Sequence, residues 1–546
     1  MHPVLRRVYA ARGVTESELP LELARLLPPA PLRGLDQACA ILEAAIRGGR
    51  RIVIAGDYDA DGATGTAVAI LGLRALGASD PGYVVPNRFR MGYGLSPALA
   101  ELAAAQGAQV LVTVDNGIAS NAGVEHARRL GMQVVITDHH LPGALLPAAD
   151  AIVNPNQPGC GFPSKHLAGV GVMFYLLLAL RARLRQSGWF ADRPEPRLGE
   201  LLDLVAVGTV ADVVRLDHNN RVLVEHGLAR IRGARARPGI RALLLVAGRD
   251  PARITSTDLG FVLGPRINAA GRLDDIRTGI ECLLAADDGA ALELARALDR
   301  LNRERREIEA QMCDEAVSLA QAQDGAVGVC LFDASWHEGV VGLVASRIKE
   351  QRHRPVIAFA RAQETGVLKG SGRSIAGLHL RDALVAIDAA EPGLLVRYGG
   401  HAMAAGLTLR EADLANFVER FDRTCRGLLD AAALERVVET DGELAAAELS
   451  LDTARALMHA GPWGQGFPEP LFEGTFQIAE ARLVGGDQTH VRYRLRSADG
   501  PTLDAMDFGG AARLRAHGPL RAAYTLSVNR YQGLESLDLH LKAMEP

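Results

Sequence analysis

The stretch Arg51–Thr66, RIVIAGDYDADGATGT, places three carboxylates at alternate positions directly after a short apolar run. Asp57, Asp59 and Asp61 repel one another when they are ionised, so a fold that gathers them needs a cation among them. Carboxylate oxygens are the ligands that hard divalent cations take. The alternative is an acidic turn that is only hydrated. A calcium loop of the EF-hand type is excluded, because Val68 occupies the position of its essential glutamate.

The elements around this stretch alternate between short apolar runs and helical patterns, which predicts βαβ units and a parallel, doubly wound sheet. The predicted strands are Ile52–Ala55, Tyr83–Val85, Val110–Val114, Val134–Thr137 and Ala151–Val153. The helices predicted between them are Ala63–Leu76, Pro97–Gln106 and Asn121–Leu130.

Polar groups follow two more of these strands. Asp115-Asn116-Gly117 comes directly after Val114, and Asp138-His139-His140 directly after Thr137. Ligands of such sheets gather beyond the carboxyl ends of the strands. Three strands therefore present acids or imidazoles at one edge, which indicates a metal-dependent site.

Downstream, the sequence holds several weaker signals. The helical run Leu201–Val207 leads to Asp212, which on periodicity alone is a turn residue. The composition of 264–272, GPRINAAGR, suits an anion-binding element. Ala291–Gln323 is a long, charged helical pattern that connects two parts of the chain, and a second α/β unit follows it. Gly370–Ser374 and Tyr398–Gly406 read as small-residue loops whose amides could approach phosphate oxygens.

The last hundred residues read as short strands with glycine-containing turns, a pattern that suggests an OB-fold barrel. Four strands are predicted: Thr475–Ala479, Val491–Arg496, Thr502–Phe508 and Ala523–Val528. Arginines are frequent there and aromatics few, so contacts to the backbone of a single strand are favoured over base stacking.

Composition limits the class of protein. A chain of 546 residues suggests three or four domains. Its net charge of −4 gives no global basic field, so local patches such as Arg230–Arg241 or Arg296–Arg306 would have to hold a polyanion, and either can equally be a hydrated helix face. Six scattered cysteines argue against thiolate zinc sites and disulfides and suit a reducing cytosol. Neither a signal peptide nor a membrane span is predicted; Val170–Leu180 is too short to cross a bilayer.

The order DYDADG, VDNG, DHH, GTVADVV and GGHAMAAG resembles the DHH phosphoesterase family with its DHHA1 domain. The stretches LGPRINAAGR, SWHEGVVGLVASR and GRS, with the terminal β-domain, resemble more closely the single-strand-specific 5′→3′ DNA exonucleases of that family. The resemblance implies an α/β fold with a parallel-sheet DHH domain and a smaller DHHA1 domain, joined by a long helix and followed by an OB-fold-like barrel. The implied segments are a helical lead-in at 1–50, the DHH domain at 51–290, the connecting helix at 291–324, the DHHA1 domain at 325–435 and the barrel at 440–546.

The resemblance also implies a site with two divalent cations, Mn²⁺ or Mg²⁺. The implied ligands are Asp59, Asp61, Asp115, His139 and Asp212, with Asp115 as the bridge. Relatives with a histidine at the position of Ala55 differ here, so Asp57 or a water completes one shell. Asp115, His139 and His140 are the implied catalytic residues. The implied substrate contacts are Arg373, Ser371, His401, Gly400, Arg266, Asn268 and Arg272. Asp138 is an orienting residue or a turn residue, and Phe89 or Tyr93 could stack on a base.

The implied function is metal-dependent 5′→3′ hydrolysis of single-stranded DNA in repair and recombination. The implied setting is a cytoplasmic monomer without a membrane, with a single-strand-binding protein and a RecQ-type helicase as partners. Two alternatives remain at this point. One is a phosphodiesterase for very short oligonucleotides or cyclic dinucleotides, and the other is a degenerate scaffold that only binds DNA or a replication partner.

Overall fold

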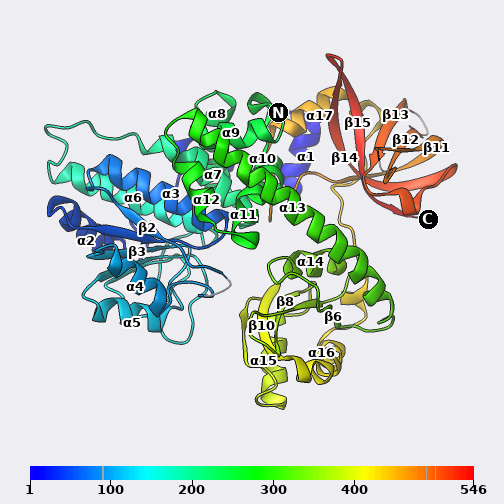
Figure 1. Cartoon of the computed structure of the whole chain (residues 1–546). Helices are drawn as coiled ribbons and strands as arrows, with labels where there is room; N and C mark the ends of the chain where they lie inside the picture. The colour runs from blue at the N-terminus through cyan, green and yellow to red at the C-terminus, as the bar shows by residue number, and fades with distance from the viewer. Residues whose placement is uncertain (89–90, 487, 498–499, 546) are drawn as a thin grey trace.

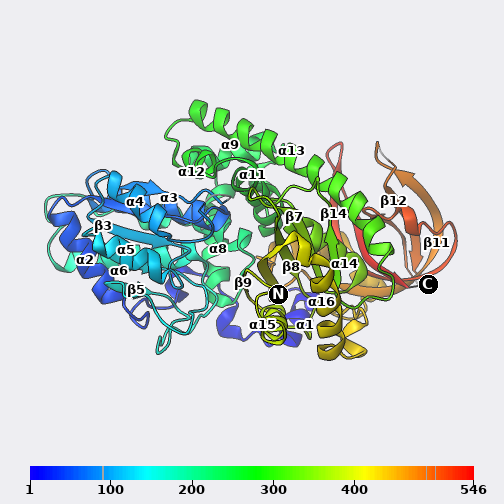
Figure 2. The same ribbon diagram turned by 60° about the horizontal axis from the view of Figure 1, so that its bottom comes forward.

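The computed structural model describes residues 1–88, 91–486, 488–497 and 500–545. Figure 1 shows two α/β lobes joined by one long helix, α13 (Asp288–Gln321), and a β-barrel at the far end from the first sheet. The first sheet and the barrel remain at opposite ends after a 60° turn, with the second lobe between them (Figure 2). The predicted fold class is confirmed.

The first lobe is built on a five-stranded parallel sheet in the order β2-β1-β3-β4-β5. Its strands are β1 (Ile52–Ala55), β2 (Gly82–Val84), β3 (Val110–Val114), β4 (Gln133–Thr137) and β5 (Ala151–Val153). Side chains of a strand alternate between faces, so Ile52 and Ile54 join one core cluster while Val53 and Ala55 join another. The helices on the first face are α2 (Leu35–Arg47), α3 (Ala60–Leu76) and α6 (Gly169–Gln186); those on the second are α4 (Pro97–Ala105) and α5 (Asn121–Arg129).

A helical region completes the first lobe and packs against α3 and α13. It consists of α7 (Leu202–Ala211), α8 (His218–Arg232), α9 (Pro238–Val246), α10 (Ser256–Asp258), the π-helix η5 (Leu259–Leu263), α11 (Gly264–Leu273) and α12 (Arg277–Leu284). The stretch GPRINAAGR is therefore a helix, α11, that packs against the connecting helix α13.

Helix α13 begins at its N-cap Asp287, whose side chain accepts a hydrogen bond from the Ala290 N–H. At 1.5 Å per residue its length is about 50 Å. Its first part packs against α9, α11 and α12, and its last part against α14 of the second lobe. The predicted connector between two lobes is therefore present.

The second lobe has a mixed sheet in the order β6-β7-β8-β10-β9. Its elements are β6 (Val329–Phe332), α14 (Val341–Arg352), β7 (Val356–Arg361), β8 (Val367–Arg373), α15 (Leu380–Ala390), β9 (Arg397–Gly400), β10 (Ala404–Arg410) and α16 (Leu414–Leu428).

The interpretation of two segments of this lobe as loops is wrong. Most of Gly370–Ser374 belongs to strand β8, and Tyr398–Gly406 contains the ends of β9 and β10 with a short turn between them. The glycines of β8 serve packing, because a methyl carbon at Gly370 would lie 2.5 Å from the Phe359 ring and one at Gly372 would lie 2.7 Å from Leu380.

The C-terminal barrel is closed in the order β11-β12-β13-β15-β14, the connectivity of an OB-fold. Its strands are β11 (Phe472–Val484), β12 (His490–Ser497), β13 (Thr502–Asp507), β14 (Gly518–Tyr531) and β15 (Leu534–Glu545). The sequence pattern missed β15. Helix α17 (Leu451–His459) packs against β14 and against the N-terminal helix α1 (Pro3–Ala11). No helix among the described residues is both long and apolar enough to span a bilayer.

Candidate metal and phosphate site

Acidic and imidazole side chains from four segments meet at the carboxyl edge of the first sheet. They are Asp57, Asp59 and Asp61 after β1, Asp115 after β3, His139 after β4 and Asp212 at the end of α7. The Nε2 atom of His139 lies 3.0 Å from Asp115 Oδ1 and 3.5 Å from Asp212 Oδ2. It also lies 4.0 Å from Asp61 Oδ2. Asp212, which the periodicity placed in a turn, therefore lies within the cluster.

The donor atoms form two groups that could each hold a cation. Those of Asp61, His139 and Asp212 all lie within 4.8 Å of one another, and the same holds for Asp57, Asp59 and Asp115. A third group of this kind, Asp115, His139 and His140, overlaps both, and the described residues contain no further group. Asp115 and Asp57 both belong to the second group, and Asp115 Oδ1 lies 3.0 Å from His139 Nε2 of the first.

Local hydrogen bonds hold the acidic loop in place. Asp59 is the N-cap of α3 and accepts a hydrogen bond from the Gly62 N–H at 3.0 Å, which satisfies an otherwise free amide of the first turn. Both oxygens of Asp61 accept from the start of α6, from Gly169 N at 2.6 Å and Val170 N at 2.9 Å. The positive end of a helix dipole favours a carboxylate there.

Asp115 has a φ of 64°, in the left-handed region that non-glycine residues seldom occupy. A methyl carbon built at Gly169 would lie 2.4 Å from Asp115 Cβ, so the start of α6 approaches this residue with no space for a side chain. Such backbone strain clusters at functional sites. The sequence did not reveal Gly169, because no local pattern encodes the contact between the start of α6 and Asp115.

Burial and mutual repulsion act on the carboxylates in the same direction. Burial, followed by the charges of the neighbouring acids, raises the pKa values of Asp57, Asp115 and Asp212 well above the usual range. Burial and Asp59 raise the pKa of Asp61 to about 7. Burial lowers the pKa of His139 to about 3, so its imidazole is neutral at pH 7 and able to coordinate.

The cluster fits a pair of hard divalent cations. Asp57 Oδ1, Asp115 Oδ1 and His139 Nε2 are buried without a hydrogen-bond partner, and buried polar atoms are normally satisfied. Ions held by these atoms would satisfy them and offset the repulsion. A shell of oxygens with a single imidazole suits Mn²⁺ or Mg²⁺ better than Zn²⁺.

Asp138 orients the DHH motif. Its Oδ1 accepts from the backbone N–H groups of His139 and His140 at 2.7 and 3.1 Å, and from His140 Nδ1 at 2.7 Å. Its Oδ2 accepts from Ile118 N at 2.9 Å. Burial alone would lower the pKa of His140, but the hydrogen bond and charge of Asp138 outweigh it and raise this pKa to about 9. In the metal-free site the hydrogen bond to Asp138 therefore favours the protonated form of His140.

The second lobe contacts this site through His401, whose ring stacks on His140 with centroids 6.0 Å apart and planes inclined by 17°. Arg373, at the end of β8, donates from Nη1 to Ser371 Oγ at 3.1 Å and to the Gly372 carbonyl at 2.8 Å. Gly400 precedes His401 with a φ of 144°. The structure thus places Ser371 and Arg373 on β8, Gly400 at the end of β9 and His401 in the turn that follows.

Several arginines gather between the lobes. Burial, followed by the charges of Arg88, Arg373 and Arg305, lowers the pKa of Arg272 to about 9. Burial and Arg88 also lower the pKa of Arg373. Cations that repel one another in this way favour a bound polyanion. Arg305 belongs to the patch Arg296–Arg306, but its side chain, which is only 11% exposed, is paired with Glu309.

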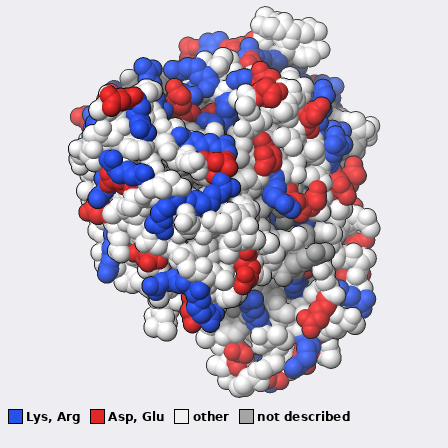
Figure 3. All heavy atoms as spheres, turned by 60° about the vertical axis from the view of Figure 1, so that its left-hand side comes forward, with Lys and Arg blue, Asp and Glu red and all other residues white. Residues whose placement is uncertain are grey.

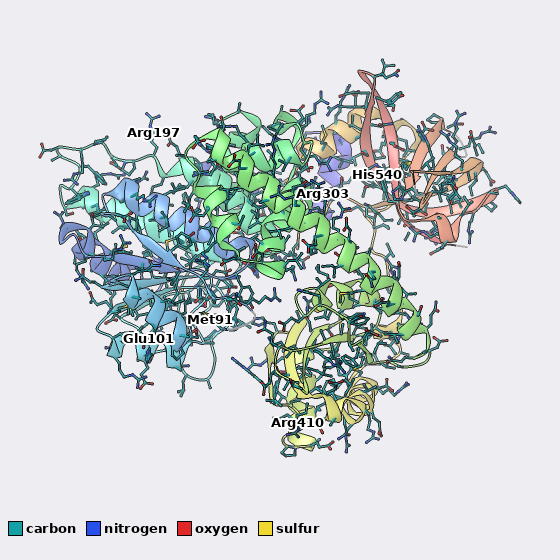
Figure 4. All side chains as sticks on the ribbon, viewed as in Figure 1. Met91, Glu101, Arg197, Arg303, Arg410 and His540 are labelled. Atoms are coloured by element: carbon teal, nitrogen blue, oxygen red, sulfur yellow. The ribbon has the colours of Figure 1, made fainter. Side chains whose placement is uncertain are left out.

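The patch Arg296–Arg306 also contains an arginine that fits the other interpretation, a hydrated helix face. Arg303, labelled in Figure 4, is 66% exposed and pairs with Asp299, as expected of a hydrated helix face. Met91, labelled in the same view, lies on the side of the first lobe that faces the second. Figure 3 shows basic and acidic side chains interspersed over another face of the molecule. The local arginine cluster is therefore the site suited to phosphate.

Two of the predicted substrate contacts on α11 have partners within the protein. Arg266 forms an ion pair with Asp299 of α13 at 2.9 Å. Asn268 Oδ1 accepts from the Ala60 N–H at 2.8 Å, in the middle of the acidic loop. Both side chains are therefore engaged within the protein.

Tyr93, one of the two residues suggested to stack on a base, lies at the carboxyl edge of the first sheet, where the acidic residues meet. Its hydroxyl donates to the Asp115 carbonyl at 3.1 Å and lies 3.1 Å from His140 Nδ1, while 46% of the residue remains exposed. Arg88 lies over the ring of Tyr58 at 4.9 Å. Phe89, the other candidate for stacking, lies outside the described residues.

Comparisons with known proteins agree with this geometry. Residues 51–209 match the DHH family, N-terminal domain, 324–427 the DHHA1 domain, and 440–543 the RecJ OB domain. The single-stranded-DNA-specific exonuclease RecJ of Dickeya dadantii is 54% identical over 100% of this chain and 96% of its own length.

Two crystal structures of RecJ from Thermus thermophilus cover all of this chain. The complex with Mn²⁺ has a TM-score of 0.83 at 34% identity over 76% of its chain, and that with Mg²⁺ a TM-score of 0.78 at 33% over 74%. With three domain matches in order and a relative this similar along its full length, the chain belongs to the RecJ family.

Proposed function

We propose that this protein is a metal-dependent exonuclease that hydrolyses the phosphodiester bonds of single-stranded DNA from the 5′ end, in DNA repair and recombination. One observation carries the proposal: two adjoining sets of cation ligands, linked by the 3.0 Å approach of Asp115 to His139, lie near an arginine cluster formed by both lobes. The relatives, which are named as single-stranded-DNA-specific exonucleases, support the substrate class.

The ligands divide between two cation positions. Asp61, His139 and Asp212 would hold one ion, Asp57 and Asp59 the other, and Asp115 would bridge them. Bound ions of this kind supply hydroxide near neutral pH and neutralise the leaving oxygen.

The residues of the chain provide charge and orientation. His140 would act as a hydrogen-bond donor to the scissile phosphate, and Asp138 holds the proton at its Nδ1 atom. A preorganised donor stabilises charge that develops on the phosphate oxygens in the transition state. His401 lies parallel to this ring, so the two lobes complete one site.

Phosphate binding is assigned to Arg373, Ser371, Gly400 and His401 of the second lobe and to Arg272 and Arg88 of the first. Arginine suits this task because its planar fork binds phosphate with two hydrogen bonds. Arg266 and Asn268 are instead assigned to the frame of the site, since their side chains bond within the protein.

The proposed limits of the parts are those drawn from the sequence: 1–50, 51–290, 291–324, 325–435 and 440–546. A barrel with the OB connectivity binds the strand beyond the catalytic lobes. A single-strand-binding protein and a RecQ-type helicase are proposed as partners, because an enzyme for single strands depends on proteins that hold or unwind DNA. The six free cysteines suit the reducing cytoplasm, and a monomer is proposed there.

Digestion of end-labelled DNA tests the proposal. Single strands labelled at the 5′ or the 3′ end and a matched duplex are incubated with Mn²⁺, Mg²⁺ or EDTA. We expect immediate release of the 5′ label as a mononucleotide, late loss of the 3′ label, an intact duplex and no reaction in EDTA.

Each result that differs from this expectation contradicts one part of the proposed function. Early release of the 3′ label contradicts the polarity, and equal digestion of the duplex contradicts the strandedness. Activity that persists in EDTA contradicts the metal centre. Cleavage of dinucleotides with no action on longer strands would establish an oligonucleotide phosphodiesterase.

A further inference from the structure

Helix α11 holds the peptide between two of the metal-site acids. Ala60 separates Asp59 from Asp61, and its N–H donates to Asn268 Oδ1 at 2.8 Å. The carboxylate of Asp61 is fixed separately, by the amides at the start of α6. Asn268 is therefore the side-chain acceptor that fixes the backbone between the two carboxylates.

The end of the same helix fills the space between the acidic loop and the second lobe. A methyl carbon at Gly271 would lie 2.0 Å from the Tyr58 carbonyl oxygen, so this backbone touches the loop directly. On the other side, a methyl carbon at Gly339 would lie 2.3 Å from the Arg272 carbonyl oxygen. Arg272 Nη1 also donates to the Gly339 carbonyl at 3.2 Å.

Gly339 lies directly before α14, whose residues Val341 and Val344 pack in the core of the second lobe. The acidic loop, the end of α11 and the second lobe are thus in continuous contact, with no space for a single methyl group at either junction. Closely packed interiors of this kind transmit a displacement and do not absorb it.

We propose that α11 couples the position of the second lobe to the affinity of the metal centre, with Asn268 as a positioning residue. Movement of the lobe at Gly339 shifts Gly271 and Asn268, and these set the spacing of Asp59 and Asp61. The second lobe, which carries the phosphate contacts, thereby tunes the cations. This inference rests on the metal centre of the proposed function.

Mn²⁺ binding to the full-length protein without DNA tests the coupling. Asn268→Ala removes the acceptor, and Gly339→Ala perturbs the far junction without touching a ligand. Partners that orient metal ligands typically change affinity by 10- to 100-fold when they are lost, so we expect each variant to weaken Mn²⁺ binding by about tenfold in a titration followed by electron paramagnetic resonance.

Matched controls exist for both substitutions. Asn121→Ala alters an exposed asparagine whose amide only reaches the Leu145 carbonyl at 3.4 Å. Gly427→Ala lies in helix α16, where nothing stands within 4 Å of an added methyl carbon. Both controls should bind Mn²⁺ as the wild type does. If Gly339→Ala does not fold, His337→Ala replaces it, because His337 Nδ1 accepts from the Gly339 N–H at 3.1 Å.

The double variant decides between a shared and a separate effect. If both changes act through α11, Asn268→Ala with Gly339→Ala weakens binding no more than the stronger single change. Wild-type affinity in Gly339→Ala, or losses that multiply in the double variant, would overturn the coupling. Failure of the wild type to bind Mn²⁺ would instead refute the proposed function itself.

Discussion

Asp115 is the residue on which most of the site converges. It is buried, has a left-handed backbone, and lies 3.0 Å from His139 between the two ligand groups. A bridging carboxylate fixes the separation of two cations, on which the charge stabilisation of the reaction depends.

Replacing this bridge should abolish hydrolysis and leave the fold intact. We expect Asp115→Ala to lower kcat on a single strand with Mn²⁺ by at least about a thousandfold, equivalent to several kcal/mol of transition-state stabilisation. Circular dichroism and thermal melting check the fold. Turnover within tenfold of the wild type would contradict the bridging role.

The raised pKa values of the cluster predict how pH affects the metal-free protein. A carboxyl whose folded pKa exceeds its unfolded value of about 3.9 binds more protons in the folded state, so stability falls as pH rises between the two values. The folded pKa of Asp61 is about 7, so part of this fall in stability occurs between pH 4 and pH 7. Bound cations remove the repulsion, so the difference in Tm between Mn²⁺ and EDTA should be larger at pH 8 than at pH 5.5. An equal difference in Tm at pH 8 and at pH 5.5 would show that repulsion among these acids does not destabilise the metal-free protein.

Arg373 is expected to act mainly in binding. Its guanidinium lies beside Ser371 and near Arg88, without a carboxylate partner among the described residues. Loss of a charge-assisted contact to phosphate should raise KM about tenfold and change kcat less. Steady-state kinetics on a short strand measure both constants for Arg373→Ala. Arg397→Ala, at an exposed position of the same lobe, is the control, and an unchanged KM for Arg373→Ala would disprove the phosphate contact.

The acidic residues could be predicted from the sequence because strand ends of one parallel sheet must meet at one edge. Asp212 required the resemblance, since a single acid after a helix carries no signal of its own. Asn268 was predicted to contact the substrate because the residues around it have a composition that suits anion binding. Its hydrogen bond to Ala60 depends instead on how α11 packs against the acidic loop, which no local sequence pattern encodes. Gly169 was missed for the same reason.

At the scale of elements, the start of α6 holds the metal edge together. Its first amides bind Asp61, and Gly169 leaves space for Asp115. The strands β8, β9 and β10 illustrate the opposite error. Their glycines suggested loops, yet Gly370 and Gly372 are required by the side chains of Phe359 and Leu380 that pack beneath them. Composition alone cannot distinguish a glycine needed for a turn from one needed for close packing.

Gly169→Ala tests the contact of α6 with Asp115. The added methyl carbon would lie 2.4 Å from Asp115 Cβ, so the helix or the strained residue must move. Overpacking of this kind costs about 1–3 kcal/mol, and the displacement of Asp115 should also weaken Mn²⁺ binding. Thermal melting and a Mn²⁺ titration measure the two effects. Gly199→Ala, where the nearest atom lies 3.9 Å away, is the control, and wild-type Mn²⁺ affinity in Gly169→Ala would show that the contact has no influence on the ligands.

At the scale of the whole molecule, the two lobes and the barrel divide the work between chemistry and retention of the strand. The net charge of −4 gives the molecule no global attraction to DNA, and basic and acidic side chains are interspersed on the face that Figure 3 shows. Long strands must therefore be held at defined places. On the barrel, Arg492 is already paired with Asp504 at 2.9 Å, whereas Arg494 and Arg496 point outward from the same strand and are exposed.

These two arginines allow the barrel to be tested without removing it. Deletion of 440–546 would also remove α17, which packs on the N-terminal helix α1, so a loss of binding could reflect damage to the fold. Replacing Arg494 and Arg496 together by Gln leaves the barrel core unchanged. Each phosphate contact on a single strand contributes about 0.7 to the slope of log K against log salt, so the slope for a strand of about 30 nucleotides should fall by about 1.4. Binding of a strand of about six nucleotides, which the catalytic lobes alone can hold, should change little. Arg423→Gln, on the exposed side of α16, controls for the loss of a surface charge. Equal losses for both lengths would mean that the barrel does not hold the strand through this face.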